Sequence, residues 1–187
     1  MMIVVTGGAA SGKSKLAEEI LNMMQGKRYY VATMHKGHDE ETLKKIERHV
    51  KMREKKGFIT VECEYNLSDA AVMVENVQES AVMVECMSNL LANEMYLAGR
   101  EDVINHVVEQ VTRLCECCKN LIIVTNEVSL DGVKYDDSTM EYIRNLQGIN
   151  GKLGDMADYV MESVFGIPVM IKGNMEDLRR EGYFEAS

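Results

Sequence analysis

The segment that most constrains the fold is residues 7–14, which match the phosphate-loop pattern G-x-x-x-x-G-K-[ST] at every fixed position. In this pattern backbone N–H groups surround nucleotide phosphates, the lysine reaches the β and γ phosphates, and the final hydroxyl ligates Mg²⁺. The residues given these roles are Gly7, Gly8, Ala9, Ala10, Ser11, Gly12, Lys13 and Ser14. An apolar run at 2–6 and a helical pattern at 13–24 place the loop between a strand and a helix. We therefore predict a nucleoside triphosphate site; the alternative is a glycine-rich turn in an ordinary α/β protein.

Apolar, β-branched runs alternate with helical patterns along the chain. Strands are predicted at 2–6, 28–33, 59–63, 81–84, 120–125, 159–165 and 168–172, and helices at 13–24, 39–56, 68–77, 88–97, 103–118 and 138–157. This order predicts an α/β fold with a mostly parallel sheet flanked by helices. The runs at 81–84 and 120–125 should be central, and the last two strands antiparallel at an edge. We expect one domain over residues 1–172, a polar tail over 173–187, and ligands at the carboxyl ends of the strands.

Composition limits the classes of partner. The 187 residues are 46% hydrophobic and carry a formal net charge of −9, so one core is expected and nucleic acid is an unsuitable general partner. We find no signal peptide or membrane-spanning run and expect a cytoplasmic protein. Five unevenly spaced cysteines suit reduced thiols. The cluster Cys115, Cys117 and Cys118 lacks zinc-finger spacing, so metal binding there is the weaker interpretation.

Acidic residues follow two of the predicted strands. Glu85 ends the run at 81–84, where a carboxylate can hold Mg²⁺ or its water beside a triphosphate. Asn126 and Glu127 end the next apolar strand on the same edge, and either can contact phosphate, metal or acceptor. The plainer interpretation is that both are ordinary polar residues of a turn, because asparagine is common at strand ends and helix starts.

The predicted helix at 39–56 gathers basic residues in an otherwise acidic chain. Lys45, His49 and Arg53 recur at helical spacing beside the apolar stripe. Two cations would hold a polyphosphate and keep the imidazole between them neutral, and a neutral imidazole nitrogen can attack phosphorus. The alternative is a solvated charged face. His35 and His38 lie in a Lys-Gly loop and His106 lies on an amphipathic helix, so these three are weaker candidates.

Several motifs in this order resemble one family over residues 1–172. They are the first strand with its phosphate loop, Tyr-Val-Ala-Thr at 30–33, Lys-Ile-Glu-Arg-His at 45–49 with Arg53, Glu62, Glu-Cys at 85–86, Val-Thr-Asn-Glu-Val at 124–128 and Ala-Asp at 157–158. The chain resembles the adenosylcobinamide kinase / adenosylcobinamide-phosphate guanylyltransferase family of cobalamin biosynthesis. The phosphate loop is shared by many nucleotide enzymes, whereas the helix histidine together with the Asn-Glu-Val strand end is more specific.

The resemblance implies a RecA-like phosphate-loop fold, a homotrimer and two reactions. The enzyme would phosphorylate adenosylcobinamide with ATP or GTP, using Mg²⁺, and then transfer GMP from GTP through a guanylyl-histidine to give adenosylcobinamide-GDP. On matching positions, His49 is the nucleophile, and residues 7–14 bind the triphosphate. The other residues that the resemblance places at the GTP site are Ala32, Thr33, Met34, Val50, Lys51, Met52, Arg53, Glu62 and Glu85.

The chain departs from the family pattern at Ala10, Glu54, Ser129, Lys134 and Gly151. We expect the changes between 127 and 152 to act on acceptor recognition, and those at Ala10 and Glu54 on contacts with the guanine. Two other functions stay open from the residues alone. One is a monofunctional small-molecule kinase in which the basic face only clamps phosphate. The other is a nucleotide-binding switch, which ranks last because the Asn-Lys-x-Asp guanine motif is absent.

Overall fold

The computed structural model describes residues 1–35, 53, 55–128 and 135–184. Its strands are β1 (Met2–Thr6), β2 (Arg28–Ala32), β3 (Ile59–Glu62), β4 (Ala81–Glu85), β5 (Asn120–Val124), β6 (Tyr159–Val164) and β7 (Ile167–Lys172). Its helices are α1 (Lys13–Met23), α3 (Asp69–Met73), α4 (Met87–Tyr96), α5 (Val103–Cys117), α6 (Asp137–Met156) and α7 (Met175–Arg180), with a 3₁₀ turn, η1, at Val77–Glu79. None of the described helices is long and apolar enough to cross a membrane.

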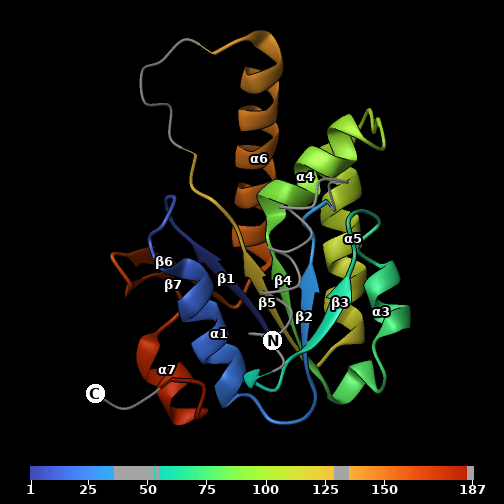
Figure 1. Ribbon diagram of the computed structural model, residues 1–187. Coiled ribbons are helices and arrows are strands. Elements are labelled where there is room, and N and C mark those ends of the chain that lie inside the picture. Colours follow the sequence, from blue (N-terminus) through green and yellow to red (C-terminus); the bar gives the residue numbers. More distant parts are fainter. Residues whose placement is uncertain (36–52, 54, 129–134, 185–187) are drawn as a thin grey trace.

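All seven strands form one sheet in the order β3-β2-β4-β5-β1-β6-β7. Every neighbouring pair is parallel except β6 and β7, which are antiparallel at one edge. The predicted α/β fold with a mostly parallel sheet is confirmed, and β4 and β5 lie in its interior as expected. Because parallel strands share a direction, the carboxyl ends of β1, β2, β4 and β5 meet at one edge, which is the upper edge in Figure 1.

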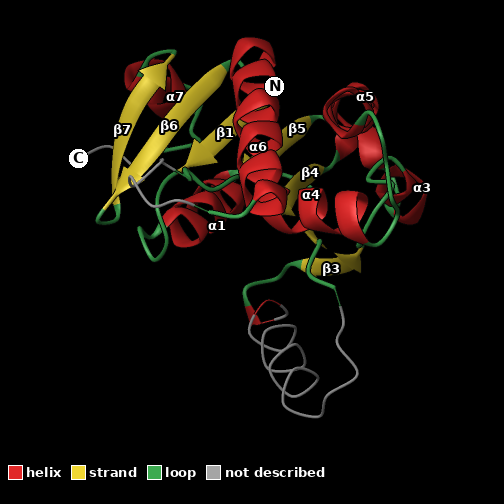
Figure 2. Cartoon of the chain, turned by 90° about the horizontal axis from the view of Figure 1, so that it is seen from above, coloured by secondary structure: helices red, strands yellow, loops and turns green. Residues whose placement is uncertain are grey.

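Helices cover both faces of this sheet. Leu16 and Ile20 of α1, with Leu178 of α7, pack on the side chains of one strand face, which includes Ile3 and Val5. Helices α3, α4, α5 and α6 pack on the other face, which includes Val4. Figure 2 shows α1 and α5 on opposite sides of the row of strands. Each inner strand therefore buries both of its faces, which explains the continuous apolar runs in the sequence.

Two segments differ from the predictions. The helix expected at 68–77 ends at Met73, because Val74 is extended and Asn76 has a left-handed φ of 52° before η1 begins. Asparagine tolerates this conformation better than most residues. The segment expected to be a polar tail includes α7, whose Leu178 is fully buried. The predicted helix at 39–56 lies outside the described residues except for Arg53, Lys55 and Lys56.

Candidate active site

The phosphate loop connects β1 to α1, as its motif predicted. Gly7 has a φ of +150°, and a Cβ there would lie 2.5 Å from Ser11 Oγ and 2.8 Å from the carbonyl oxygen of Ser163. Gly12 has a φ of +91°, which L side chains rarely adopt, and its Cβ would lie 3.1 Å from Gly166 Cα. The two fixed glycines of the motif are thus required by conformation and by close approach.

The turn between β6 and β7 supports the loop from the side. The carbonyl oxygen of Ser11 accepts hydrogen bonds from Gly166 N at 2.7 Å and from Ser163 Oγ at 2.8 Å. Ser163 lies about 150 residues further along the chain, and its side chain is buried. The sequence motif gave no sign of this support, because it depends on β1 and β6 being neighbours in the sheet.

Lys13 is 8% exposed, and its Nζ donates a hydrogen bond of 3.0 Å to the carbonyl oxygen of Gly8. It forms no ion pair within the part of the chain that the structure describes. A largely buried ammonium group with one carbonyl partner attracts an anion. This is the arrangement expected for a lysine that reaches the terminal phosphates.

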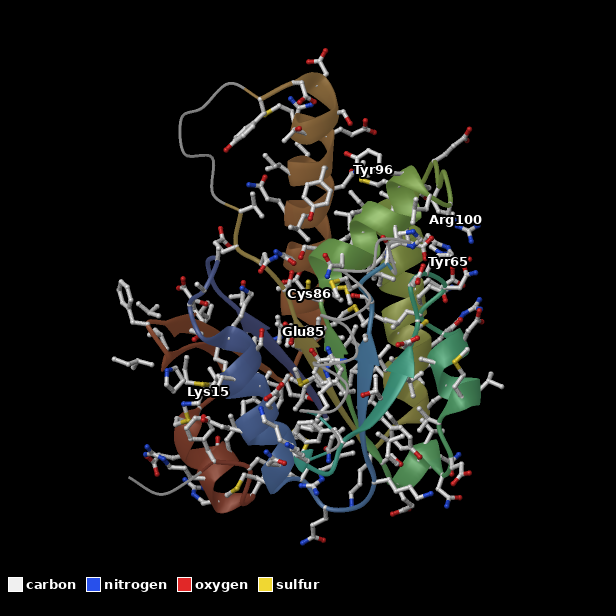
Figure 3. The ribbon with its side chains drawn as sticks, viewed as in Figure 1. Lys15, Tyr65, Glu85, Cys86, Tyr96 and Arg100 are labelled. Carbon is white, nitrogen blue, oxygen red and sulfur yellow. The ribbon has the colours of Figure 1, made fainter. Side chains whose placement is uncertain are left out.

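Glu85 ends β4, which is separated from β1 by β5. Ser14 Oγ donates a hydrogen bond of 2.5 Å to Glu85 Oε1, and Glu85 Oε2 is buried without a hydrogen-bond partner among the described residues. Burial raises the pKa of Glu85, Glu18 raises it further, and the Ser14 hydrogen bond, Lys13 and Arg53 oppose the rise. Figure 3 shows Glu85 and Cys86 at the upper end of β4, beside α1. The two predicted metal ligands therefore meet, and the free carboxylate oxygen suits a cation.

Arg53 packs on the face of the sheet that α1 covers. Its Cζ lies 3.8 Å from the ring centroid of Tyr30, on β2, in a cation–π contact. Lys56 pairs with Glu18 of α1. The carboxyl-terminal end of the basic segment is thus fixed against β2 and α1, close enough to Glu85 to lower its pKa. His49, Val50, Lys51 and Met52 lie outside the described residues, so their roles stay predictions.

The residues predicted at the ends of β2 and β3 differ in how far they are buried. Ala32 is in register with Glu62, which is exposed at the end of β3. Thr33 is buried, and its hydroxyl donates to the carbonyl oxygen of Cys86 at 2.8 Å, so its side chain links β2 to β4. Met34 is partly exposed and follows it. These residues border the edge that holds Glu85.

Asn126 belongs to a network that sequence reasoning did not find. Its Nδ2 donates to Ser88 Oγ at 2.6 Å, and Tyr142 donates to the carbonyl oxygen of Ser88 at 3.1 Å. Asn150 Nδ2 donates to the carbonyl oxygen of Asn126 at 3.1 Å. The bonds tie the end of β5 to α4 and α6, and only the strand-end position of Asn126 hinted at them. Glu127 is exposed, and its N–H donates to the carbonyl oxygen of Gly7 at 3.1 Å.

The cysteine cluster lies at the end of α5, away from this edge. All five cysteines are free, and burial raises the pKa of Cys118 to about 12. No group of three or more potential metal ligands occurs within residues 1–35, 53, 55–128 and 135–184. His106 packs instead near the buried carboxylate of Glu94, with Nε2 and Oε1 3.5 Å apart.

Comparison with protein families gives a match over residues 3–171 to the model described as cobinamide kinase / cobinamide phosphate guanyltransferase. Two bifunctional adenosylcobalamin biosynthesis proteins, from Salmonella typhimurium and Escherichia coli, are each 30% identical over 186 residues, which cover 92% of this chain and all of the relative. A third such protein, from Pseudomonas aeruginosa, is 25% identical over 173 residues, which cover 92% of this chain and 98% of the relative.

Among solved structures, the chain is similar to a prototypical ATPase from the type III secretion system of pathogenic bacteria. The TM-score is 0.51 at 15% identity, with 95% of this chain and 60% of that chain covered. At this identity the likeness concerns the fold alone.

Proposed function

The chain belongs to the cobinamide kinase / cobinamide phosphate guanyltransferase family, and from this membership we propose that it modifies one corrinoid acceptor twice. The first reaction phosphorylates adenosylcobinamide with ATP or GTP, and the second attaches GMP to the product. The observation that supports this most directly is the hydrogen bond from Ser14 to Glu85 at the phosphate loop. The charges of Lys13 and Arg53 lie close enough to this carboxyl to lower its pKa.

In the first reaction the hydroxyl oxygen of the aminopropanol arm attacks the γ phosphorus of the nucleotide. The bond from that phosphorus to the β–γ bridging oxygen breaks, the hydroxyl proton is lost, and nucleoside diphosphate leaves. The backbone of residues 7–14 holds the phosphates, and Lys13 neutralises negative charge on the β and γ oxygens. Catalysis of this kind depends mainly on holding the reacting groups in place and on neutralising charge. The buried ammonium group of Lys13 provides a positive charge at a fixed position.

We further propose that Mg²⁺ accompanies the nucleotide, held by Ser14 and Glu85. The unpartnered Oε2 of Glu85 and the hydroxyl of Ser14 are hard oxygen ligands of the type Mg²⁺ prefers. When bound, the ion would neutralise charge on the phosphate oxygens. Because ligation requires the ionised carboxylate, the raised pKa of Glu85 makes metal binding weaker at acidic pH.

In the second reaction a ring nitrogen of His49 attacks the α phosphorus of GTP and pyrophosphate leaves. The phosphate oxygen of the corrinoid then attacks the same phosphorus, the bond between phosphorus and histidine breaks, and adenosylcobinamide-GDP forms. Arg53 supports this role for His49, because the two are four residues apart and Arg53 lies against Tyr30, near Glu85. The residues proposed to complete the GTP site are Ala32, Thr33, Met34, Val50, Lys51, Met52 and Glu62.

Labelling with α-³²P GTP tests the second reaction. Wild-type protein should retain label that is stable to alkali and lost in acid, and His49→Ala should retain none while still phosphorylating adenosylcobinamide. His35→Ala is the matched control, because His35 is exposed and contacts Glu64, and the label on this variant should persist. Unlabelled wild-type protein that still phosphorylates the corrinoid would support a monofunctional kinase instead.

We also propose a homotrimer that acts in the cytoplasm, where its nucleotide substrates occur. Apolar side chains exposed around the β6–β7 hairpin support an interface between copies. They are Val164, Phe165, Ile167 and Val169. Phe165 is 95% exposed, and large apolar side chains gathered on one edge commonly mark contact surfaces.

A further inference from the structure

A cavity of about 410 Å³ lies on the face of the sheet that α6 covers. Val4, Val160 and Ile171, from β1, β6 and β7, form its apolar floor, and the second half of α6 forms its wall. Figure 2 shows α6 lying beside β1 and β6. We call this cavity the α6 groove. It is the size of a site for a small ligand or for one arm of a large one.

The upper end of the α6 groove meets the phosphate loop. Thr6 and Glu127 line the groove there, and Thr6 directly precedes Gly7. The N–H of Glu127 donates to the carbonyl oxygen of Gly7 at 3.1 Å. A molecule lying in the groove would therefore place its upper end at the same edge of the sheet as Lys13, reached from the face opposite α1.

One polar group in the groove lacks a partner. Thr6 Oγ1 is buried and makes no hydrogen bond with any residue that the structure describes. Its neighbour Thr125 differs, because Thr125 Oγ1 already donates to Asn150 Oδ1 at 2.7 Å. A buried hydroxyl without a partner is unusual in folded proteins. A ligand in the groove with a polar group near Thr6 would satisfy it.

Two glycines of α6 leave the wall of the groove without side chains. Gly148 has a packing reason, because a Cβ there would lie 2.9 Å from Ile104 Cδ1. Gly151 and Gly154 line the groove, and an added Cβ at either would meet no atom within 4 Å. Glycine is unfavourable inside a helix compared with alanine, so packing and propensity both leave these two unexplained. Their effect is an unobstructed wall.

We infer that the α6 groove binds the amide-linked aminopropanol arm of the corrinoid acceptor and delivers its hydroxyl to the phosphate loop. The inference rests on the proposed function. The apolar floor suits the carbon chain of such an arm, while Thr6 and Glu127 suit its amide groups. The bulky corrin ring stays outside, because the cavity has room for an arm only. Larger side chains on the wall would exclude the acceptor and leave the nucleotide site intact.

The test uses Gly154→Leu, which fills the groove, and Thr6→Val, which removes the unpartnered hydroxyl at nearly constant volume. Each should raise the KM for adenosylcobinamide about tenfold, Gly154→Leu by occupying space that the arm needs and Thr6→Val by removing one buried polar contact. Both should leave the Kd for GTP unchanged. Gly154→Leu should also raise the Tm by about 2–4 °C, because leucine favours the helix. Glu141→Leu, at an exposed position of α6 outside the groove, is the matched control and should keep the wild-type KM.

The outcomes separate this inference from the proposed function. Wild-type KM values in both variants, with normal folding, would overturn the groove as the acceptor site. If wild-type protein binds adenosylcobinamide without phosphorylating it, the kinase assignment fails, and binding to the two variants still decides the groove. Equal weakening of GTP and acceptor would mean that the variants disturb the phosphate loop, which also contradicts the inference.

Discussion

Lys13 and Lys15 are two residues apart on α1 and have opposite surroundings. Lys13 is buried beneath the phosphate loop, whereas the side chain of Lys15 is 81% exposed and pairs with Glu19 at 3.6 Å. Figure 3 labels Lys15 on the outer side of α1. Since both carry one positive charge, substituting each in turn separates the effect of location from that of net charge.

We expect Lys13→Ala to lower kcat for phosphorylation by about 10²–10³-fold, because a preorganised charge at the transferred phosphate is lost. Guanylylation should fall as well, since both reactions use the same triphosphate site. Steady-state kinetics with adenosylcobinamide measures the first effect and α-labelled GTP the second. Lys15→Ala should keep wild-type rates, and similar losses in both variants would contradict a specific role for Lys13.

Glu85→Gln should lower activity about 10–100-fold, because an amide is a poor substitute for a ligating carboxylate. It should nevertheless stabilise the free protein. The pKa of Glu85 is raised above its usual value of 4.5, so the folded state binds the extra proton and wild-type stability falls as pH rises through the folded pKa. Thermal denaturation should show a larger advantage for the variant at pH 8 than at pH 4.5. A variant less stable than wild type at pH 8 would contradict this reasoning.

Long apolar runs were the most predictable segments of the chain. The strands β4 and β5 could be predicted from continuous apolar runs, because strands covered on both faces carry apolar residues at every position. Val82 and Ile122, from these runs, are fully buried in the structure. The phosphate loop and Glu85 could be singled out because glycine and charge stand out in an apolar sequence, whereas the helix predicted at 39–56 stays a prediction. Contacts between distant segments were missed, including the Ser163 hydrogen bond to Ser11 and the Ser88 network, because no local pattern reports them.

Helix α7 was missed because it is short and carries mostly charged residues, so a single buried leucine gives no periodicity. Leu178 is fully buried against the cluster that contains α1. Leu178→Ala should lower the free energy of unfolding by about 2–5 kcal/mol, as for other buried leucines. Urea denaturation measures this. Arg180→Ala is the control, because that side chain is 76% exposed, and its change should stay within about 0.5 kcal/mol. Equal midpoints for the two variants would show that α7 does not help to hold the core.

The exposed apolar side chains of the β6–β7 hairpin predict self-association. Wild-type protein should sediment as three copies of the 21.1-kDa chain. Phe165 and Gly166 form a two-residue turn with φ values of 51° and 81°, a conformation that favours Asn-Gly. Phe165→Asn combined with Ile167→Thr should therefore keep the hairpin and shift the sedimenting species toward single copies.

The matched control for this prediction is Val72→Gln on α3, where the valine is 88% exposed on another surface. It should leave the sedimentation profile unchanged. A wild-type protein that sediments as one copy, or a double variant that still sediments as three, would contradict the hairpin interface.

The strand β1 can fold into the sheet only after much later segments of the chain have been synthesised. This strand is synthesised before its partners β5 and β6, which begin at Asn120 and Tyr159, and before the turn that braces the phosphate loop, which comes after residue 162. A nascent chain on the ribosome therefore carries the whole loop sequence long before the loop can take its shape. Nucleotide capture should begin only after β6 and the following turn have been synthesised, so chains that end before this turn do not sequester GTP.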